Sequence, residues 1–417
     1  MSYISEIDSL LREYIPLVSS LPGGEEVIKR SRKLMSIFGN PQNKLRVIHV
    51  AGTSGKTSTS YYIRALLQEG GHKTGLTVSP HIDKVTERVQ VNGEPLPDDR
   101  FLELLKEFVG IVKGSGLEPS YFELLYAFSF WVFEQLEVDY AIIETGIGGK
   151  YDATNVVETK DKLCVITDIG FDHTEILGYT LPEIASQKAG IIHHGNTVIT
   201  CHQSGPVFDV IADRAKECSS KLMIVEQQTV SRELPLYQRR NFSLALAAYN
   251  YLAGRDGLVS LTPEQIALAE TSYIPARLER VTINTKTVIM DGAHNPQKIE
   301  ALIHTVRELY PGTKATFVLS LKASKIIEGI GPSIKPIASK VIVTRFKTTE
   351  DLRTRAINPG LLAERLIDEG LDRVEVEPDQ EKALSDALKE DSSLVIITGS
   401  FYLISQLRAG KILNKYL

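Results

Sequence analysis

The chain has few cysteines, no long apolar run and no excess of basic residues, and each of these absences excludes a class of protein. Its three cysteines, Cys164, Cys201 and Cys218, form no Cys-x-x-Cys pair. They predict no disulfide framework. Thiols that pack in the interior of a protein in a reducing compartment are their expected role.

Membrane attachment, secretion and broad nucleic-acid binding are not indicated. No apolar run approaches the length of a membrane span, and the amino-terminal MSYISEIDSLLREYI lacks the basic region and apolar core of a signal peptide. The formal net charge is −5, which leaves a P-loop motor or nucleic-acid enzyme poorly supported. We therefore expect a cytoplasmic protein that meets any anionic ligand with a local basic site.

The segment from Leu45 to Ser60, LRVIHVAGTSGKTSTS, has the order of a phosphate-binding loop. An apolar, β-branched run is followed by Gly52-Thr53-Ser54-Gly55-Lys56-Thr57-Ser58 and then by a helical pattern. Backbone N–H groups of such a loop surround phosphate oxygens, and the helix N-terminus adds a partial positive charge. Lys56 is expected to reach the β- and γ-phosphates of ATP, and the Thr57 hydroxyl to help hold Mg²⁺.

One glycine of the general phosphate-loop pattern is missing. The pattern has a glycine five residues before Gly55, where this chain has Val50. An ordinary strand-to-helix turn with a solvated Lys56 is the alternative interpretation. The coincidence of a strand, a Gly-Lys pair and a hydroxyl residue favours the phosphate loop.

Length and element order predict two α/β domains. The 417 residues exceed the size at which one core keeps growing, and 43% hydrophobic and 24% charged residues are ordinary for a globular protein. We expect a P-loop NTPase-like domain with a mainly parallel sheet at 1–278 and a smaller doubly wound, Rossmann-like domain at 279–417. The expected strands are Leu45–Val50, Thr74–Val78, Asp139–Glu144, Leu163–Thr167, Thr197–Thr200, Thr287–Met290, Ala315–Leu319, Lys340–Val343, Val374–Glu377 and Leu394–Thr398, and the expected helices include a buried one at Phe122–Leu136 and another at Gln297–Tyr310.

Polar side chains follow three of the expected strands. Ser79 begins the motif Ser-Pro-His, Glu144 ends an apolar run, and Asp172-His173 follow another. Each has an ordinary structural interpretation, as a turn serine, a strand-end carboxylate or a hydrogen-bonded histidine. Because ligands bind at the carboxyl ends of parallel strands, together they could surround Mg²⁺ and a triphosphate. Ser79 and Glu144 offer the oxygen ligands that Mg²⁺ prefers. His173 could bind a second metal, but Mg²⁺ accepts a nitrogen ligand only reluctantly.

Further motifs make a specific resemblance. In order, they are HVAGTSGKTST (His49–Thr59), SPHI (Ser79–Ile82), ERVQVNG (Glu87–Gly93), YFELLYAF (Tyr121–Phe128), ETGIGGKYDATN (Glu144–Asn155), ITDIGFDHTEILGYTLPEIASQKAGI (Ile166–Ile191), PARLE (Pro275–Glu279) and DGAHNP (Asp291–Pro296). The chain resembles the folylpolyglutamate synthase/dihydrofolate synthase family of the Mur ligase superfamily. The motifs cover most of the first domain and the start of the second.

The resemblance implies roles for matching positions. Ser79 and Glu144 match ligands of a first Mg²⁺, and His173 matches a ligand of a second. Lys188 matches a lysine that is carbamylated in the family, which gives it an oxygen donor for the second metal; an ordinary helix lysine is the alternative. The positions that match nucleotide contacts at the domain junction are Asn241, Arg277, Asp291 and His294.

The acid acceptor is less well defined. Ser120-Tyr121-Phe122-Glu123 and Asp152-Ala153-Thr154 match the region that holds the pterin in dihydropteroate-using members. The loop GTSGKTS departs from the usual GTNGKGS, and Lys150 replaces the arginine of GGRLDATN, which exchanges a bidentate fork for a point charge. Dihydropteroate, a reduced folate, or both therefore remain open as acceptors.

The implied reaction is ATP-dependent amide formation through an acyl phosphate, with L-glutamate as the amine. Lys56, His173 and Lys188 are the expected catalytic residues, and closure of the second domain is expected to exclude water. A muramyl-peptide ligase is an alternative, but only about 50 residues precede the loop, too few for its extra amino-terminal domain. A non-catalytic ATP-binding regulatory protein is a second alternative. We expect a monomer.

Overall fold

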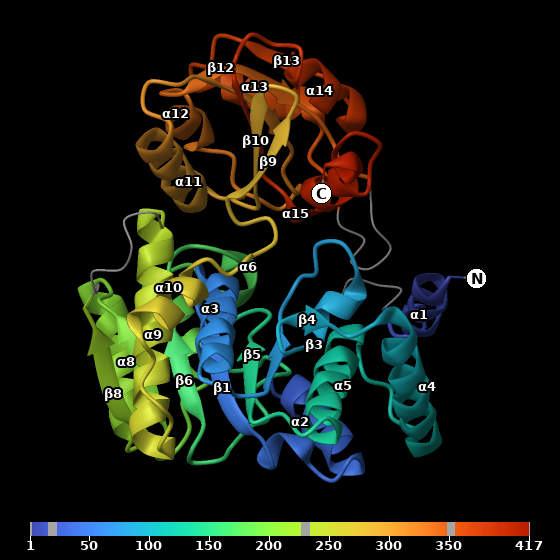
Figure 1. Cartoon of the computed structure of the whole chain (residues 1–417), viewed down its shortest axis with the longest axis vertical. Helices are drawn as coiled ribbons and strands as arrows, with labels where there is room; N and C mark the ends of the chain where they lie inside the picture. Colours follow the sequence, from blue (N-terminus) through green and yellow to red (C-terminus); the bar gives the residue numbers. More distant parts are fainter. Residues whose placement is uncertain (1, 16–22, 227–233, 348–354, 417) are drawn as a thin grey trace. The chain divides into compact units, whose positions relative to one another are not determined.

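Each of two units of the chain is built around its own mainly parallel sheet. The computed structural model describes residues 2–15, 23–226, 234–347 and 355–416. The units are Met1–Tyr273 and Ile274–Leu417 (Figure 1). This division lies within the segment Ser272–Glu279, a few residues before the expected boundary at 278/279.

The first sheet places the strand that leads into the phosphate loop at its centre. Its strand order is β4-β3-β2-β5-β1-β6-β7-β8. The strands from β2 to β8 in this order are parallel, and only β3 and β4, at one edge, are antiparallel to their neighbours. The strands are β1 (Arg46–Ala51), β2 (Thr74–Thr77), β3 (Gln90–Val91), β4 (Glu94–Pro95), β5 (Tyr140–Glu144), β6 (Leu163–Ile166), β7 (Thr197–Cys201) and β8 (Lys221–Val225).

Helices cover both faces of this sheet, as expected for parallel strands (Figure 1). Helices α3 and α9 pack together against one face, and α5, α7 and α8 form apolar clusters with the other. The helices of the first unit are α1 (Tyr3–Arg12), α2 (Glu25–Ile37), α3 (Lys56–Glu69), α4 (Asp98–Ser115), α5 (Tyr121–Gln135), α6 (Thr174–Leu177), α7 (Leu181–Ala189), α8 (Gly205–Glu217), α9 (Leu236–Asp256) and α10 (Pro263–Glu270).

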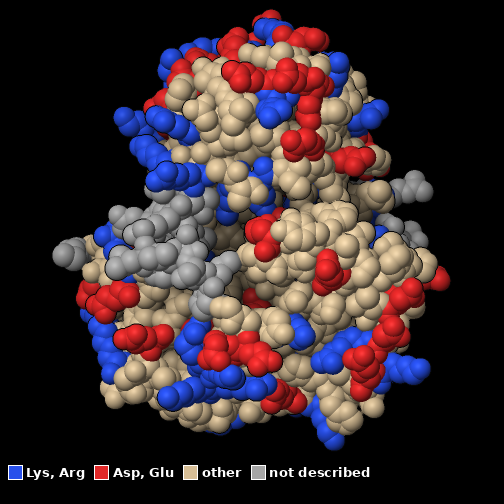
Figure 2. Space-filling model, turned by 180° about the vertical axis from the view of Figure 1, so that it is seen from behind, with Lys and Arg blue, Asp and Glu red and all other residues tan. Residues whose placement is uncertain are grey.

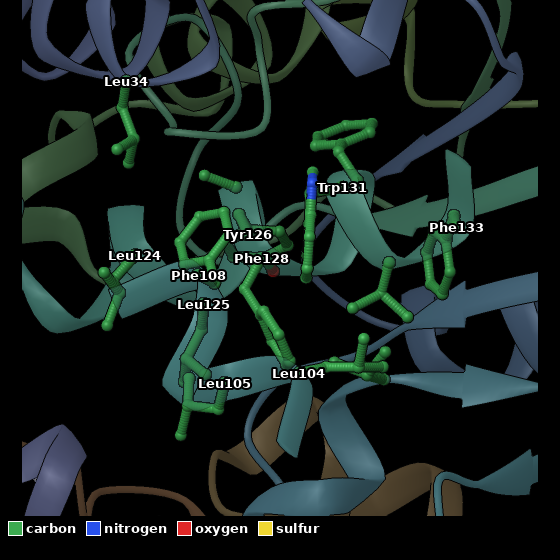
Figure 3. Packing of buried hydrophobic residues seen from close by; sticks show 14 of the residues in the cluster. Leu34, Leu104, Leu105, Phe108, Leu124, Leu125, Tyr126, Phe128, Trp131 and Phe133 are labelled. Carbon is green, nitrogen blue, oxygen red and sulfur yellow. The ribbon is translucent and has the colours of Figure 1, made fainter. Parts of the chain in front are cut away.

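An aromatic cluster holds α5 in place (Figure 3). Phe108 of α4 stacks on Phe38 with ring centroids 4.1 Å apart, and its ring lies 5.4 Å from Phe128 and 5.6 Å from Trp131 of α5. Helices α2 and α4 pack against α5, and α1 packs on α4, which explains why the sequence of α5 is apolar on nearly every side. The amino-terminal end of α5 is thereby fixed near the carboxyl end of β5.

The second sheet has the order β13-β12-β11-β14-β10-β9, in which only β9 is antiparallel. Its strands are β9 (Glu279–Ile283), β10 (Lys286–Asp291), β11 (Ala315–Leu319), β12 (Ala338–Val343), β13 (Val374–Val376) and β14 (Leu394–Thr398). Its helices are α11 (Pro296–Leu309), α12 (Ile330–Ile334), α13 (Pro359–Asp368), α14 (Gln380–Ala387) and α15 (Phe401–Arg408). The predicted fold class, two successive α/β units that each contain a mainly parallel sheet, is confirmed.

The surface charges and the positions of the cysteines agree with what the composition predicts. Figure 2 shows acidic and basic side chains interspersed on the visible face of each unit. The three cysteines are buried free thiols. Among the described residues, no helix is long and apolar enough to cross a membrane.

Candidate active site

The phosphate-loop segment lies where three parallel strands end. Strand β1 is hydrogen-bonded between β5 and β6, so the carboxyl ends of all three meet at one edge of the sheet. Val50, the position of the missing glycine, is fully buried inside β1 and pairs with Glu144. The turn therefore starts only at Gly52, and helix α3 begins at Lys56.

The loop is held by the segment that follows β6. The backbone N–H groups of Thr53 and Ser54 donate to the Asp168 carbonyl oxygen at 2.8 and 3.2 Å. The Thr167 hydroxyl donates to the Ser54 carbonyl oxygen at 2.7 Å. All three contacts involve residues that precede α3, so none of them uses a backbone N–H group at the amino-terminal end of that helix.

Two loop positions require glycine. Gly52 has φ +154°, and a Cβ there would lie 1.8 Å from Thr167 Oγ1. Gly55 has φ +88°, and a Cβ there would lie 2.2 Å from Asn241 Oδ1 of α9. Asn241, which the sequence assigns to the nucleotide, therefore lies directly against the loop, with its Nδ2 donating to Gln238 Oε1 at 3.1 Å. A larger residue at either glycine would change the loop shape.

Two lysines converge on this loop from different helices. Lys56 Nζ, at the start of α3, donates to the Gly52 carbonyl oxygen at 3.0 Å. Lys188 Nζ, in the last turn of α7, donates to the same oxygen at 2.9 Å, and Lys188 is 3% exposed. The loop thus has the local basic site that the acidic composition of the chain requires for an anionic ligand.

The buried carboxylate of Glu144 connects the loop helix to the Ser-Pro-His segment. Glu144 is 1% exposed; its Oε1 accepts the Thr57 hydroxyl at 2.9 Å, and its Oε2 accepts the Ser79 backbone N–H at 3.3 Å. The Tyr126 hydroxyl donates to the Glu144 carbonyl oxygen at 2.7 Å and contacts Ser79 Oγ at 3.4 Å. The Glu144 carboxylate and the hydroxyls of Thr57 and Ser79 are hard oxygen donors, and such a set fits Mg²⁺.

His173 lies at the amino-terminal end of α6, with a left-handed backbone (φ 51°). Its imidazole is about one-third exposed; Nε2 lies 3.9 Å from Asp172 Oδ1, and Nδ1 lies 3.9 Å from Glu175 Oε1. Within the described ranges, no group of three or more His, Cys, Asp and Glu side chains could hold a metal. The assignment of His173 and Lys188 to a second metal stays a prediction.

The first acceptor segment begins helix α5. Ser120 Oγ accepts the Glu123 N–H at 3.4 Å, and the Glu123 carboxylate accepts the Ser120 N–H at 2.9 Å and pairs with Arg30 at 2.7 Å. These two side chains therefore cap the helix and join α5 to α2. The other two residues of this segment, Tyr121 and Phe122, are aromatic. The Arg88 guanidinium lies 5.5 Å from the centroid of the Tyr121 ring. The Phe122 ring packs directly against Gly146, where an added Cβ would lie 1.9 Å from Phe122 Cζ.

The second acceptor segment contains a buried carboxylate. Asp152 Oδ1 accepts the Thr154 N–H at 3.0 Å and the Thr154 hydroxyl at 2.6 Å, and Oδ2 accepts the Ile147 N–H at 2.9 Å. Burial raises the pKa of Asp152, and these hydrogen bonds oppose that rise. Ala153 is buried between the two. The segment is therefore a fixed turn against the end of β5.

Sequence reasoning did not single out two residues of this region, His49 and Tyr126. His49 lies inside β1 with its side chain on the same face as Val47, and its Nε2 is 2.8 Å from Thr154 Oγ1. A polar residue within an apolar run, between Ile48 and Val50, was the available signal for His49. Tyr126 carried no such signal, because a tyrosine in an apolar helix resembles any other core residue.

Three residues that the resemblance assigns to the nucleotide, Arg277, Asp291 and His294, lie close together in the second unit. Asp291, at the end of β10, accepts the Leu278 N–H at 2.8 Å and the Ala293 N–H at 2.9 Å. His294 Nδ1 lies 2.7 Å from the Gly292 carbonyl oxygen. Its ring is 6.2 Å from that of Phe401, over which Arg277 lies at 4.5 Å. Arg277 and His294 thus approach the same aromatic ring at the carboxyl edge of the second sheet.

Two domain profiles match the chain. The Mur ligase middle domain matches residues 50–229, and the Mur ligase glutamate ligase domain matches residues 276–401. Together with the phosphate loop at the centre of a parallel sheet, these matches define the protein as an ATP-dependent acid–amino-acid ligase of the Mur type.

Curated relatives narrow this class. A dihydrofolate synthetase of Saccharomyces cerevisiae is 31% identical over 414 residues, which cover 91% of this chain and 96% of that protein. A dihydrofolate synthase/folylpolyglutamate synthase of Bacillus subtilis is 31% identical over 413 residues, with 91% and 93% covered. The chain belongs to the folylpolyglutamate synthase/dihydrofolate synthase family.

Solved structures agree over the whole length. The folylpolyglutamate synthase of Mycobacterium tuberculosis, complexed with ADP, superposes with a TM-score of 0.85 at 26% identity, with 98% of each chain covered. The FolC protein of E. coli, in complex with DHPP and ADP, gives a TM-score of 0.83 at 25% identity, with 98% of this chain and 97% of that chain covered. The predicted family is confirmed.

Proposed function

We propose that this ligase joins L-glutamate to dihydropteroate, to a folate, or to both, with ATP as the phosphate donor. The observation that carries the proposal is the phosphate loop with Lys56 and Lys188 at Gly52 and the buried Glu144 beside it. Relatives named for these two activities, and a relative solved with ADP and DHPP, support the choice of substrates.

The proposed chemistry has two steps. A carboxylate oxygen of the acceptor attacks the γ-phosphorus of ATP, the bond from phosphorus to the bridging oxygen breaks, and ADP leaves. The α-amine of L-glutamate then attacks the acyl phosphate, loses a proton and expels inorganic phosphate. Negative charge gathers on the transferred phosphoryl group in the first step, so the Lys56 ammonium and the N–H groups at the amino-terminal end of α3 stabilise its transition state.

Metal binding forms part of the proposal. Thr57, Ser79 and Glu144 would hold a first Mg²⁺, and His173 with a carbamylated Lys188 would hold a second. A metal in the first site neutralises phosphate charge. The burial of Lys188 against Gly52 supports the carbamate, because a buried amine is protected from the solvent protons that release CO₂.

The remaining site residues are assigned to ligands. We assign Asn241, Arg277, Asp291 and His294 to the nucleotide. Tyr121, Phe122, Asp152, Ala153 and Thr154 are assigned to the acceptor. Ser120 and Glu123 contribute to the same region by capping α5, which presents the two aromatic rings. The domain assignment, 1–278 for ATP and 279–417 for ligation, is proposed with them.

A monomer in the cytoplasm completes the proposal. The buried thiols of Cys164, Cys201 and Cys218 suit a reducing compartment. Sedimentation velocity of the purified chain, at several concentrations, measures the oligomeric state directly. A concentration-independent value for one chain is the expected result.

Turnover assays test the function. Purified protein with ATP and Mg²⁺ should release phosphate only when both L-glutamate and a pteroate-type acid are present, and mass spectrometry should find the acid extended by one glutamate. Dihydropteroate and tetrahydrofolate, assayed side by side, separate the two acceptor classes. Turnover with a UDP-muramyl compound instead would identify a muramyl-peptide ligase, and tight ATP binding without turnover of any acid would identify a regulatory protein.

A further inference from the structure

A chain of hydrogen bonds joins the strand that leads into the phosphate loop to the acceptor segment. His49 of β1 lies three residues before Gly52, and its Nε2 is 2.8 Å from Thr154 Oγ1. That hydroxyl is 2.6 Å from Asp152 Oδ1. His49 is fully buried and Asp152 is 6% exposed, so water screens neither link.

The direction of these hydrogen bonds follows from the chemistry of the groups. A carboxylate only accepts, and Asp152 also accepts the N–H groups of Ile147 and Thr154, so the hydroxyl hydrogen of Thr154 points to Asp152 Oδ1. The Thr154 oxygen must then accept from His49, which places the imidazole proton on Nε2. His49 Nδ1 is buried, with no hydrogen-bond partner in the part of the chain that the structure describes.

We propose that His49 is a positioning residue for the acid acceptor: its neutral Nε2–H tautomer orients the Thr154 hydroxyl, which in turn fixes the Asp152 carboxylate. This inference rests on the proposed function, in which Asp152 belongs to the acceptor site. His49 also ties that site to β1, so the acceptor segment and the phosphate loop are held at a fixed separation by one central strand.

The alternative is that His49 only fills the core. A core residue would affect folding and all substrates alike, whereas a positioning residue affects the acid acceptor and acts only through Asp152. The orphaned Nδ1 favours positioning, because a leucine would fill the same space without leaving a buried nitrogen unpaired.

Steady-state kinetics of four variants separate the two roles. His49→Leu and Thr154→Val remove the donor and the relay hydroxyl, and each should raise the KM for the acid about tenfold, the size expected for one hydrogen bond to an ionised network. The KM for ATP should stay within about twofold in both. His49→Gln, which keeps an Nε2–H donor, and Thr154→Ser, which keeps the hydroxyl, should recover most of the loss.

A double-mutant cycle gives the decisive readout. Once Asp152→Asn has been made, His49→Leu should add little to the KM for the acid, because the group it positions is already altered. Equal additional losses in both backgrounds, or equal rises in the KM values for ATP and acid, would assign His49 to packing alone. Urea midpoints establish whether each variant folds. If His49→Leu fails to fold, His49→Gln and Thr154→Ser still test the proposal.

The tautomer can be measured without turnover. In ¹⁵N-histidine-labelled protein, His49 should give a protonated Nε2 resonance and an unprotonated Nδ1 resonance at neutral pH, and the assignment follows from the His49→Gln spectrum. A protonated Nδ1 would overturn the inference. If the wild-type protein extends no pteroate-type acid, the proposed function fails, whereas an unchanged KM in His49→Leu with an active wild type refutes only the inference.

Discussion

Lys56 and Lys188 donate to one carbonyl oxygen, that of Gly52, at 3.0 and 2.9 Å. They reach it from the first turn of α3 and the last turn of α7. While both are ammonium groups, they repel each other at this one neutral acceptor. The proposed carbamate on Lys188 would remove that repulsion and leave the Lys56 ammonium to meet the phosphate. This arrangement distinguishes the loop from an ordinary strand-to-helix turn, where a single solvated lysine would suffice.

Removal of the Lys56 charge should abolish most catalysis. Lys56→Met keeps the length of the side chain but loses the ammonium that stabilises the transferring phosphoryl group. We expect kcat to fall about 10² to 10³-fold. Phosphate release under saturating substrates measures this change. Lys56→Arg keeps the charge with a different geometry, so it should retain more activity than methionine; equal activity of the two variants would contradict an electrostatic role.

Lys188 should make the activity depend on CO₂. Prolonged incubation in degassed, mildly acidic buffer should remove the proposed carbamate and lower turnover, and bicarbonate should restore it. Lys188→Met should be nearly inactive and should not respond to bicarbonate. Labelling with ¹³C-bicarbonate gives the direct test, since a carbamate carbon signal is expected in the wild type and not in Lys188→Met. Its absence from active wild-type protein would refute the modification.

Glu144→Gln should raise the Mg²⁺ requirement. The amide keeps an acceptor for the Thr57 hydroxyl but loses the negative charge, and we expect the half-saturating Mg²⁺ concentration to rise about 10- to 100-fold. Mg²⁺ titrations of ATP turnover measure it. Glu123→Gln is the matched control, because Glu123 is also a buried carboxylate but is paired with Arg30. It should lower stability and leave the Mg²⁺ requirement unchanged.

The aromatic cluster around α5 should dominate the stability of the first unit. Phe108 is fully buried between Phe38 and the rings of α5, so Phe108→Ala should lower the free energy of unfolding by about 3 to 5 kcal/mol. Ile111, on the same helix, is 40% exposed, and Ile111→Ala should change it by less than about 0.5 kcal/mol. Urea unfolding followed by Trp131 fluorescence compares the two. Similar losses would contradict the assignment of the core.

Acid should destabilise the fold partly through His193. Burial, with the charges of Lys162 and Arg214, lowers the pKa of His193 from 6.5 to about 3, and Lys162 Nζ donates to its Nδ1 at 3.3 Å. Because the folded pKa lies below the unfolded one, this contribution to stability is present above pH 6.5 and is lost as the pH falls toward 3.

The pH dependence of unfolding measures this effect. His193 should steepen the fall in stability by at most ~1.4 kcal/mol per pH unit between about pH 6 and pH 4. His193→Asn keeps an acceptor for Lys162 but does not titrate in this range, so its stability should fall less steeply. Parallel curves for the two proteins would show that His193 is protonated in the folded state.

The sequence predicted the elements that depend on local patterns. Leu45–Val50 became β1 at Arg46–Ala51, and the apolar Phe122–Leu136 became α5 at Tyr121–Gln135. Both follow from periodicity within one segment. The antiparallel edge strands β3 and β4 have only two residues each, too few to show a period.

Partners distant in the sequence limited the site prediction. The capping of α5 by Ser120 and Glu123 can be read from their three-residue spacing, but the pairing of Glu123 with Arg30 of α2 depends on how two helices pack. The contact of His49 with Thr154 likewise depends on the register of β1 in the sheet. Motifs name residues, whereas only the fold decides which of their side chains face one another.

The contact between Gly52 and Thr167 limits how freely the loop could be transplanted. The Thr167 hydroxyl occupies the space of a side chain at Gly52 and bonds to the Ser54 carbonyl oxygen. A designer who grafts Gly52–Thr57 onto another strand–helix junction would carry the recognisable motif but leave behind Thr167, the residue directly after β6 that shapes it. The transferable unit is therefore a pair of adjacent strands with their ends, and a nucleotide site copied as a short peptide should bind poorly until Thr167 accompanies it.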